Sequence, residues 1–161
     1  MRRIHKMLIA AGLLAIAFAL LPWIATAIPE AAGLTAVSVP TGSMEPAVPA
    51  GSMAYVADGD ASEGDVAAFY ALDGRTLVLH RVLEIDDGSG TMLTKGDANP
   101  APDVSRVPCG NTVGVLRASV PYLGSLAETM RTPAGRVCRA MLGYAGAMCL
   151  VMAACCRRRR Y

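Results

Sequence analysis

The stretch Pro40-Thr41-Gly42-Ser43-Met44-Glu45-Pro46 lies between an apolar N-terminal segment and a series of short apolar runs. Gly42 leaves space beside Ser43 because it has no side chain. Pro46 disfavours helical geometry at Glu45, so Ser43 is expected on a turn and not inside a helix. A serine in this setting is either an ordinary polar residue of a turn between two strands or an exposed nucleophile, and this stretch alone fits both.

Short apolar runs bounded by Gly, Pro and Asp follow on both sides of this turn. Their alternation predicts six strands, at residues 34–39, 53–57, 66–72, 76–85, 91–95 and 112–120. Asp73-Gly74 between two of the runs predicts a hairpin. Residues 96–108 are expected to form a loop, and Pro121 is expected to begin a short helix that ends near Met130. The predicted fold class is mainly β, a compact domain over residues 28–135. Residues 132–139 are expected to link this domain to a second apolar segment.

The N-terminal segment, residues 7–27, has no charged residue and is long enough to cross a bilayer, which takes roughly 20 apolar residues. Arg2, Arg3 and Lys6 precede it and predict a cytoplasmic N-terminus over residues 1–6. The alternative is a cleaved signal peptide, because Ala25-Thr26-Ala27 has the small-x-small pattern of a cleavage site. The apolar run exceeds the usual signal-peptide core of about 7–15 residues, which favours an uncleaved transmembrane helix.

A second apolar segment is predicted at residues 136–156 and is followed at once by the arginine run 157–160. Arginines directly after an apolar stretch indicate a cytoplasmic tail, here residues 157–161. Both termini are therefore expected in the cytoplasm of a multi-pass protein of the cell membrane, with the β domain outside it. The alternative is an amphipathic or buried helix with a solvated tail.

Charge and cysteine use agree with this topology. All 13 acidic residues lie between Glu30 and Glu128, whereas nine of the 15 basic residues lie outside residues 30–131. A nucleic-acid-binding domain gathers its basic residues on one folded face, so nucleic acid is not an expected partner. Four of the five cysteines lie at or after position 138, and Cys109 is alone in the β domain, which excludes an internal disulfide framework there. Cys155 and Cys156, beside the basic tail, are either S-acylated or plain apolar filling.

His80 is the one histidine of the predicted β domain, in the middle of an apolar strand. A histidine there is either structural or a base, and a serine hydroxyl needs an adjacent base to act as a nucleophile. A carboxylate on the far ring nitrogen would fix the tautomer of the imidazole. The loop after residue 95 offers Asp97 and Asp103 for this position. One histidine without paired cysteines is a poor metal site, so no metal and no cofactor is expected.

Four stretches of the chain, taken in order, resemble the successive sequence boxes of the type I signal peptidases, a likeness that covers about residues 7–131. The four are Thr41-Gly42-Ser43-Met44-Glu45-Pro46, Gly64-Asp65-Val66, His80-Arg81-Val82 and Thr94-Lys95-Gly96-Asp97-Ala98-Asn99. The usual bacterial members pair the serine with a lysine that precedes the arginine of the third box. His80 stands at that position, which is similar to the endoplasmic-reticulum and archaeal branch with its Ser, His and Asp. Lys95 does not occupy the position of the base.

The resemblance implies a role for each matching residue. Ser43 corresponds to the nucleophile and His80 to the general base. Asp103 corresponds to the acidic third member, and Asp97 is either a second candidate for that role or a support of the site. Thr41 stands where the family places a hydroxyl residue that assists the oxyanion. The implied fold is a signal-peptidase-like β domain with a transmembrane helix at each end.

The implied activity is that of a membrane-bound serine endopeptidase that cleaves signal peptides from exported preproteins. Its expected partners are therefore the signal peptides of preproteins and the lipid bilayer. The sequence leaves open which preproteins are cut and whether partner subunits take part. One alternative is a non-catalytic β binding module, secreted or membrane-anchored; the secreted form predicts a mature N-terminus at Ile28. Another is a self-cleaving Ser-Lys protease of the repressor type, which would need a lysine in place of His80 and a DNA-binding head.

Overall fold

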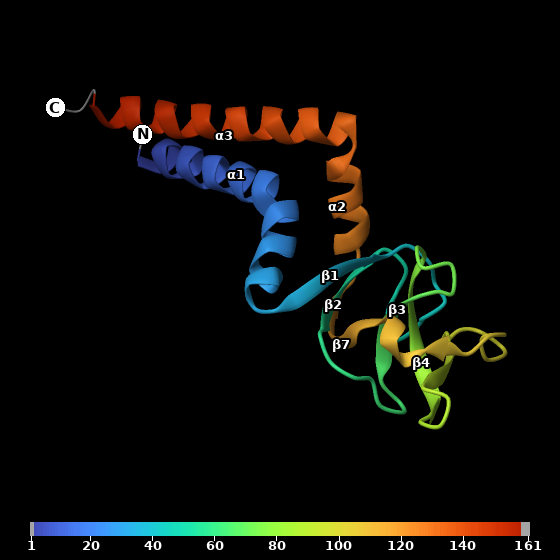
Figure 1. Ribbon diagram of the computed structural model, residues 1–161. Coiled ribbons are helices and arrows are strands. Elements are labelled where there is room, and N and C mark those ends of the chain that lie inside the picture. The colour runs from blue at the N-terminus through green and yellow to red at the C-terminus, as the bar shows by residue number, and fades with distance from the viewer. Residues whose placement is uncertain (1, 159–161) are drawn as a thin grey trace. The chain divides into compact units, whose positions relative to one another are not determined.

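A computed structural model describes residues 2–158 of the chain, so Met1 and residues 159–161 of the expected tail lie outside the described residues. The chain divides into two compact units. One, called the helical unit below, consists of the chain up to Ile24 together with the chain from Ala127. The other, called the β unit, is Ala25–Leu126. Both boundaries fall inside helices, α1 (Arg2–Ala31) and α2 (Leu123–Arg131), which begin in one unit and end in the other (Figure 1).

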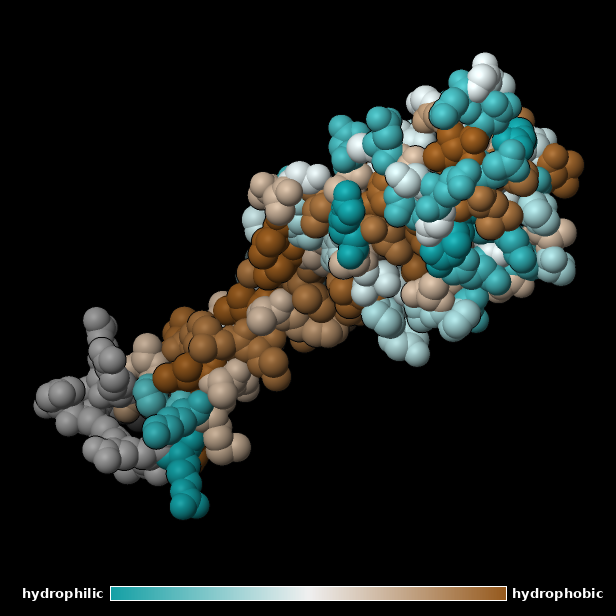
Figure 2. Space-filling view, turned by 90° about the horizontal axis from the view of Figure 1, so that it is seen from below, coloured by the Kyte–Doolittle hydropathy of each residue, from teal (hydrophilic) through white to brown (hydrophobic). Residues whose placement is uncertain are grey.

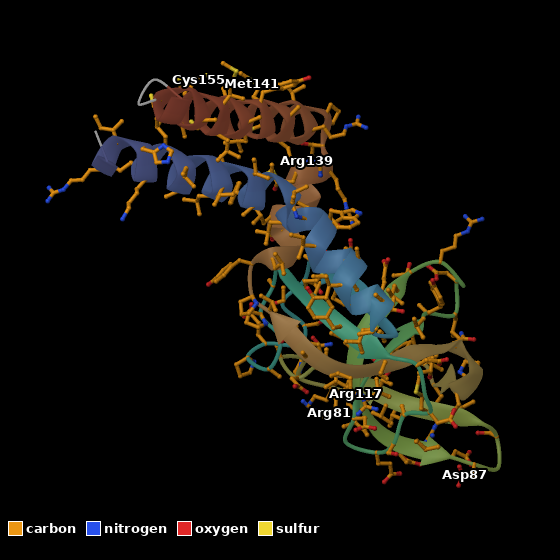
Figure 3. All side chains as sticks on the ribbon, turned by 90° about the vertical axis from the view of Figure 1, so that its left-hand side faces the viewer. Arg81, Asp87, Arg117, Arg139, Met141 and Cys155 are labelled. Atoms are coloured by element: carbon orange, nitrogen blue, oxygen red, sulfur yellow. The ribbon has the colours of Figure 1, made fainter. Side chains whose placement is uncertain are left out.

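The helical unit contains two helices long and apolar enough to cross a membrane. They are α1 and α3 (Pro133–Arg158), with candidate spans Arg3–Ala31 and Pro133–Cys156. The most apolar 18-residue stretches within these spans have mean hydropathies of 2.4 and 1.6. Large apolar side chains are exposed on both, for example Leu14 on α1. On α3 an example is Met141, which is labelled in Figure 3. On the face seen in Figure 2, hydrophobic residues predominate over the helical unit, with a group of hydrophilic residues toward one end, whereas the surface of the β unit is mixed.

Helix α3 begins at Pro133, so the segment predicted as a linker, residues 132–139, is helical from its second residue onward. Thr132 is the residue that separates α2 from α3, and its hydroxyl accepts a hydrogen bond from the Gly135 backbone N–H. Such a side-chain cap satisfies a free donor at the start of a helix, and proline is favoured at the first helical position. The Thr132-Pro133 pair thus starts a helix at the beginning of the predicted linker.

Helices α1 and α3 lie side by side in the helical unit (Figures 1 and 3). The two backbones come close at Gly12 and Gly146, where a Cβ atom on either residue would lie 2.8 Å from the carbonyl oxygen of the other. Small residues allow two helix backbones to approach in this way. Near the ends of the pair, the ring nitrogen Nδ1 of His5 donates to the carbonyl oxygen of Ala153 at 3.1 Å.

The β unit is a seven-stranded sheet with the order β1-β2-β7-β3-β4-β5-β6, in which every neighbouring pair is antiparallel. The strands are β1 (Leu34–Val39), β2 (Ser52–Ala57), β3 (Val66–Tyr70), β4 (Leu77–Asp86), β5 (Thr91–Lys95), β6 (Val107–Pro108) and β7 (Thr112–Val120). The predicted β class and the bounds of β1, β5 and β7 are confirmed. Other details differ from the prediction: β3 ends at Tyr70 and not at residue 72, β6 lies within the predicted loop, and Pro121 precedes α2 by two residues. The bounds of β2 and β4 differ from the predicted ones by one residue.

Both faces of the central strands are buried, which places the core on two sides of the sheet. Val66 and Ala68 of β3 belong to one apolar cluster, together with Val37, Val39, Met44, Val48, Ala54, Val56 and Leu79. Ala67 and Phe69 belong to the other, with Val82, Met92 and Val107. Successive side chains of a strand point to opposite faces. On β4, therefore, Leu79 joins the first cluster and His80 faces the second.

The C-terminal part of α1 is attached to the sheet through the Ala25 carbonyl group. In an α-helix the Ala25 carbonyl would accept from the N–H of residue 29, but Pro29 has none. The hydroxyl of Tyr55, on β2, donates to this carbonyl oxygen at 3.0 Å. Burial raises the pKa of Tyr55 above its ordinary value, in keeping with a phenol that donates this bond in its neutral form.

Candidate active site

Ser43 lies on the turn that joins β1 to β2, as the sequence predicts. The turn is closed by backbone bonds from Glu45 N–H to the Gly42 carbonyl at 3.0 Å and from Val48 N–H to the Met44 carbonyl at 2.8 Å. The side chains of Met44 and Val48 are fully buried in the first apolar cluster. Burial of one such side chain stabilises a fold by about 1.5–3 kcal/mol. The residue after Ser43 thus anchors the turn while Ser43 itself stays half-exposed.

The loop after β5 braces the backbone of Ser43 from the other side. The Ala98 N–H donates to the Ser43 carbonyl oxygen at 2.9 Å. A Cβ atom at Gly96 would lie 2.6 Å from the same oxygen, a separation that real Cβ contacts do not show. Gly96 is therefore required by the close approach of the two loops, and any side chain there would push Ser43 out of place.

His80 is held on β4 between Ser43 and the loop that contains Asp103. Its backbone pairs with Ala67 of β3, its ring edge packs against Phe69 with 6.5 Å between ring centroids, and only 9% of the residue is exposed. The ring nitrogen Nε2 lies 3.3 Å from the Ser43 hydroxyl oxygen. This distance is long for a hydrogen bond, as is common at catalytic pairs before substrate binds.

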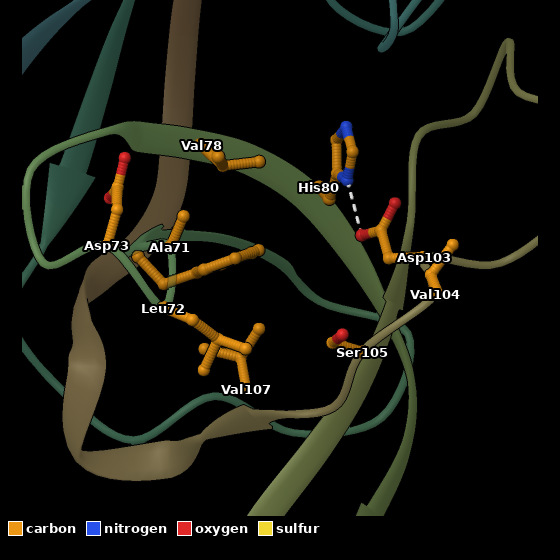
Figure 4. A pocket seen from close by; sticks show the side chains of 10 residues that line it. Ala71, Leu72, Asp73, Val78, His80, Asp103, Val104, Ser105 and Val107 are labelled. Atoms are coloured by element: carbon orange, nitrogen blue, oxygen red, sulfur yellow. Dashed lines mark hydrogen bonds and ion pairs between the residues drawn. The ribbon is translucent and has the colours of Figure 1, made fainter.

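Asp103 completes a line of three side chains. Its Oδ2 atom lies 2.6 Å from His80 Nδ1, and Figure 4 shows the other ring nitrogen pointing away from this carboxylate. A carboxylate accepts and does not donate, so Nδ1 carries the hydrogen when the ring is neutral. Nε2 is then the free acceptor that faces the Ser43 hydroxyl. The network therefore assigns the tautomer that a general base needs.

Asp97 takes part in a different contact. Its two carboxylate oxygens accept from Arg81 Nε at 2.8 Å and from a second Arg81 nitrogen at 2.6 Å, and Arg81 also donates to the Gly64 carbonyl at 2.8 Å. The hydrogen bonds and charge of Arg81 lower the pKa of Asp97. The sequence leaves open which of the two aspartates contacts the histidine. The structure brings Asp103 to His80 and pairs Asp97 with Arg81.

The Arg81–Asp97 pair predicts an acid-sensitive contribution to stability. Because the pKa of Asp97 is lowered on folding, the pair stabilises the chain fully above the aspartate pKa of the unfolded chain, about 3.9. This stabilisation is lost as the pH falls through the lower pKa of the folded state. Asp97→Asn is expected to cost about 2 kcal/mol at neutral pH. Thermal unfolding of the detergent-solubilised chain over a pH series measures the difference.

The matched control is Asp87→Asn, which alters an exposed aspartate at the turn of the β4–β5 hairpin (Figure 3). It is expected to change the free energy of unfolding by less than about 0.5 kcal/mol. If the free energies of unfolding of wild type and Asp97→Asn differed by the same amount at neutral and at strongly acidic pH, the predicted pH dependence of this ion pair would be contradicted.

Thr41 lies next to the proposed nucleophile, with 3.4 Å between its hydroxyl oxygen and that of Ser43. Two hollows adjoin His80. One, of about 420 Å³, runs between β1 and β4 and is lined by Val37, Ser38, Val39, Pro40, Thr41, Ser43, Thr76, Leu77, Val78, Leu79 and His80. The other, of about 430 Å³, opens on the Asp103 side and is drawn in Figure 4. Ser43 lines the first hollow and Asp103 the second.

Two contributors to the site were not singled out from the sequence. Thr94 is fully buried and its hydroxyl donates to Asp103. Arg81 fastens the start of the loop that braces Ser43. Both residues belong to the four stretches that resemble the peptidase boxes. The sequence does indicate Thr94, as a threonine at an inward-facing strand position next to a loop that contains two aspartates.

No model of a known protein family matches the chain, and no curated protein matches it. Within residues 2–158, no group of three or more His, Cys, Asp or Glu side chains is placed to hold a metal ion.

Proposed function

We propose that the chain is a membrane-bound serine endopeptidase that removes signal peptides from exported preproteins, of the endoplasmic-reticulum and archaeal type of signal peptidase. The observation that carries the proposal is the line of contacts from Ser43 through His80 to Asp103, at 3.3 and 2.6 Å. A nucleophile, a base and a carboxylate that orients the base define this class of hydrolase by geometry rather than by chain order.

The proposed mechanism begins when His80 Nε2 takes the Ser43 hydroxyl proton and the Ser43 oxygen attacks the scissile carbonyl carbon. The protonated ring is stabilised by Asp103 and then donates its proton to the leaving amine, which leaves an acyl-enzyme on Ser43. A water molecule, deprotonated in turn by His80, attacks the ester carbonyl. The acid product is released, and the proton returns to Ser43.

An oxyanion forms on the substrate carbonyl during each attack. The family resemblance assigns its stabilisation to the Ser43 backbone N–H and the Thr41 hydroxyl. The 3.4 Å separation between the Thr41 and Ser43 hydroxyl oxygens supports this assignment. One such donor typically lowers the barrier by about 3–4 kcal/mol.

The hollow between β1 and β4 supports the choice of substrate. It ends at Ser43 and is walled largely by aliphatic side chains such as Val39, Leu77 and Leu79. Strand β1 lies at one edge of the sheet. An extended peptide can add to such an edge through main-chain hydrogen bonds, with alternate side chains turned into the hollow. Small apolar side chains before the cut, which the family prefers, suit walls of this kind.

The two apolar helices support placement in a membrane. With α1 and α3 as transmembrane helices and arginines flanking them, both termini would be cytoplasmic and the β unit outside. A preprotein's signal sequence also resides in the bilayer. Confinement of enzyme and substrate to one membrane raises the effective concentration of the cleavage segment.

The test is processing of a model preprotein by the purified full chain in proteoliposomes. We expect one cut after a small-x-small segment, identified by the mass of the mature product. A matched preprotein with phenylalanine as the last residue before the cut should stay intact, because the larger ring does not fit. Absence of processing by the wild type, or equal processing of both preproteins, would overturn the proposal.

A further inference from the structure

Thr94 is a polar residue at a position that packing alone would give to an apolar one. It lies on β5 with none of its surface exposed, and it shares the inward-facing side of that strand with Met92. A buried hydroxyl destabilises a fold unless it is hydrogen-bonded. Valine has nearly the same shape and no such cost. The hydroxyl of Thr94 is therefore best explained by the group to which it donates.

That group is the carboxylate of Asp103. Thr94 Oγ1 donates to Asp103 Oδ2 at 2.6 Å, and the same oxygen accepts from His80 Nδ1 at 2.6 Å. In addition, the Asp103 backbone N–H donates to the Thr94 carbonyl at 2.8 Å. The backbone bond fixes where the loop passes β5. The hydroxyl bond fixes the rotation of the carboxylate.

The Asp103 carboxylate could instead rotate toward the open hollow, away from His80. The Asp103 side chain is 26% exposed, and the residue lines the open hollow on its side of His80 (Figure 4). Water in that hollow competes for the carboxylate oxygens, since hydrogen bonds to solvent are nearly as favourable as those within the protein. A donor on the buried side counteracts this competition by holding Oδ2 in line with the imidazole.

We propose that Thr94 is a positioning residue of the active site, which holds the Asp103 carboxylate against His80 through its hydroxyl. The role rests on the proposed peptidase function and acts through Asp103, without contact to the substrate. The hydroxyl, and not the bulk of the side chain, carries the effect, so serine can replace threonine and valine cannot.

The kinetic test compares Thr94→Val and Thr94→Ser in the full chain in proteoliposomes. Loss of a charge-assisted hydrogen bond predicts that Thr94→Val lowers kcat by about 10-fold. KM should change by less than about twofold, because the substrate hollow is untouched. Thr94→Ser should restore kcat to within about threefold of wild type. The control is Thr91→Val on the same strand, whose hydroxyl bonds Ser89 in the turn; it should leave both constants unchanged.

A double variant locates the effect. In an Asp103→Ala background, Thr94→Val should cause no further loss, because residues that act as a unit are non-additive. The inference is overturned if Thr94→Val keeps wild-type kcat, if Thr94→Ser is as impaired as Thr94→Val, or if the loss persists without Asp103. Thermal unfolding of each variant separates these outcomes from a failure to fold.

A spectroscopic readout keeps the inference testable if the wild type cleaves no preprotein. The chain has two histidines, so nuclear magnetic resonance of isotope-labelled histidine resolves His80 once His5→Gln has assigned the other ring. We expect a low-field, slowly exchanging Nδ1 proton for His80 in the wild type and in Thr94→Ser. Thr94→Val should broaden or lose it. An unchanged signal in Thr94→Val would sink the positioning role independently of the enzymatic activity.

Discussion

Ser43→Ala is expected to lower the rate of preprotein cleavage by about four orders of magnitude or more, the usual consequence of removing a triad nucleophile. Alanine leaves the buried Met44 and the bracing contact of Ala98 to the residue 43 carbonyl in place. The turn should therefore keep its conformation, and only the hydroxyl 3.3 Å from His80 is lost. Single-turnover cleavage in proteoliposomes measures the rate.

His80→Ala provides the companion measurement. If Ser43 and His80 act as one unit, the double variant should be no slower than the slower single variant. Ser119→Ala, which removes a hydroxyl on β7, is the matched control and should retain wild-type activity. Ser43→Ala with wild-type rates would mean that another group performs the attack.

Asp103→Asn is expected to lower kcat by about 10³–10⁴-fold, whereas Asp97→Asn should lower it by about 10-fold or less. An amide at position 103 carries no charge to stabilise the protonated ring, and its N–H group can favour the tautomer with Nε2 protonated. Asp97 contacts Arg81 and braces the loop, so its loss acts on the geometry of Ser43 indirectly. Parallel cleavage assays of the two variants give the ratio.

The ratio of the two kcat values is the informative quantity, because both variants remove one negative charge from the same loop. They differ in the partner that loses a carboxylate, His80 in Asp103→Asn and Arg81 in Asp97→Asn. A reversed order, with Asp97→Asn the slower enzyme, would assign the carboxylate of the triad to Asp97. Thermal unfolding gives a second distinction, since Asp97→Asn should be the less stable variant at neutral pH through its loss of the Arg81 pair.

The strands were predictable because their sequences carry a regular signal. Alternation and turn residues place β1, β5 and β7 at their observed bounds, and Asp73-Gly74 joins β3 to β4 as expected. The two-residue strand β6 has no room for an alternating pattern. The start of α3 does carry a sequence signal, the Thr132-Pro133 cap. The charged residue Arg136 nearby made the segment resemble a polar linker instead of the first turn of an apolar helix.

The site was predictable in its residue types and only partly in its contacts. A serine turn, a lone histidine and a loop with two aspartates are visible in the sequence. The choice between Asp97 and Asp103 depends on the path of an irregular Pro-rich loop, for which no periodicity exists. The contact of Thr94 with Asp103 joins β5 to that loop, and strand patterning says only that position 94 faces inward.

The bond from Tyr55 to the Ala25 carbonyl has a practical consequence for preparing a soluble fragment. A fragment beginning at Gly33, just before β1, would strip the buried phenol of its acceptor at a cost of about 1–3 kcal/mol. Beginning at Ala25 retains the acceptor together with the last turns of the helix. The preferred cut for crystallisation therefore lies inside α1, several residues ahead of the first strand.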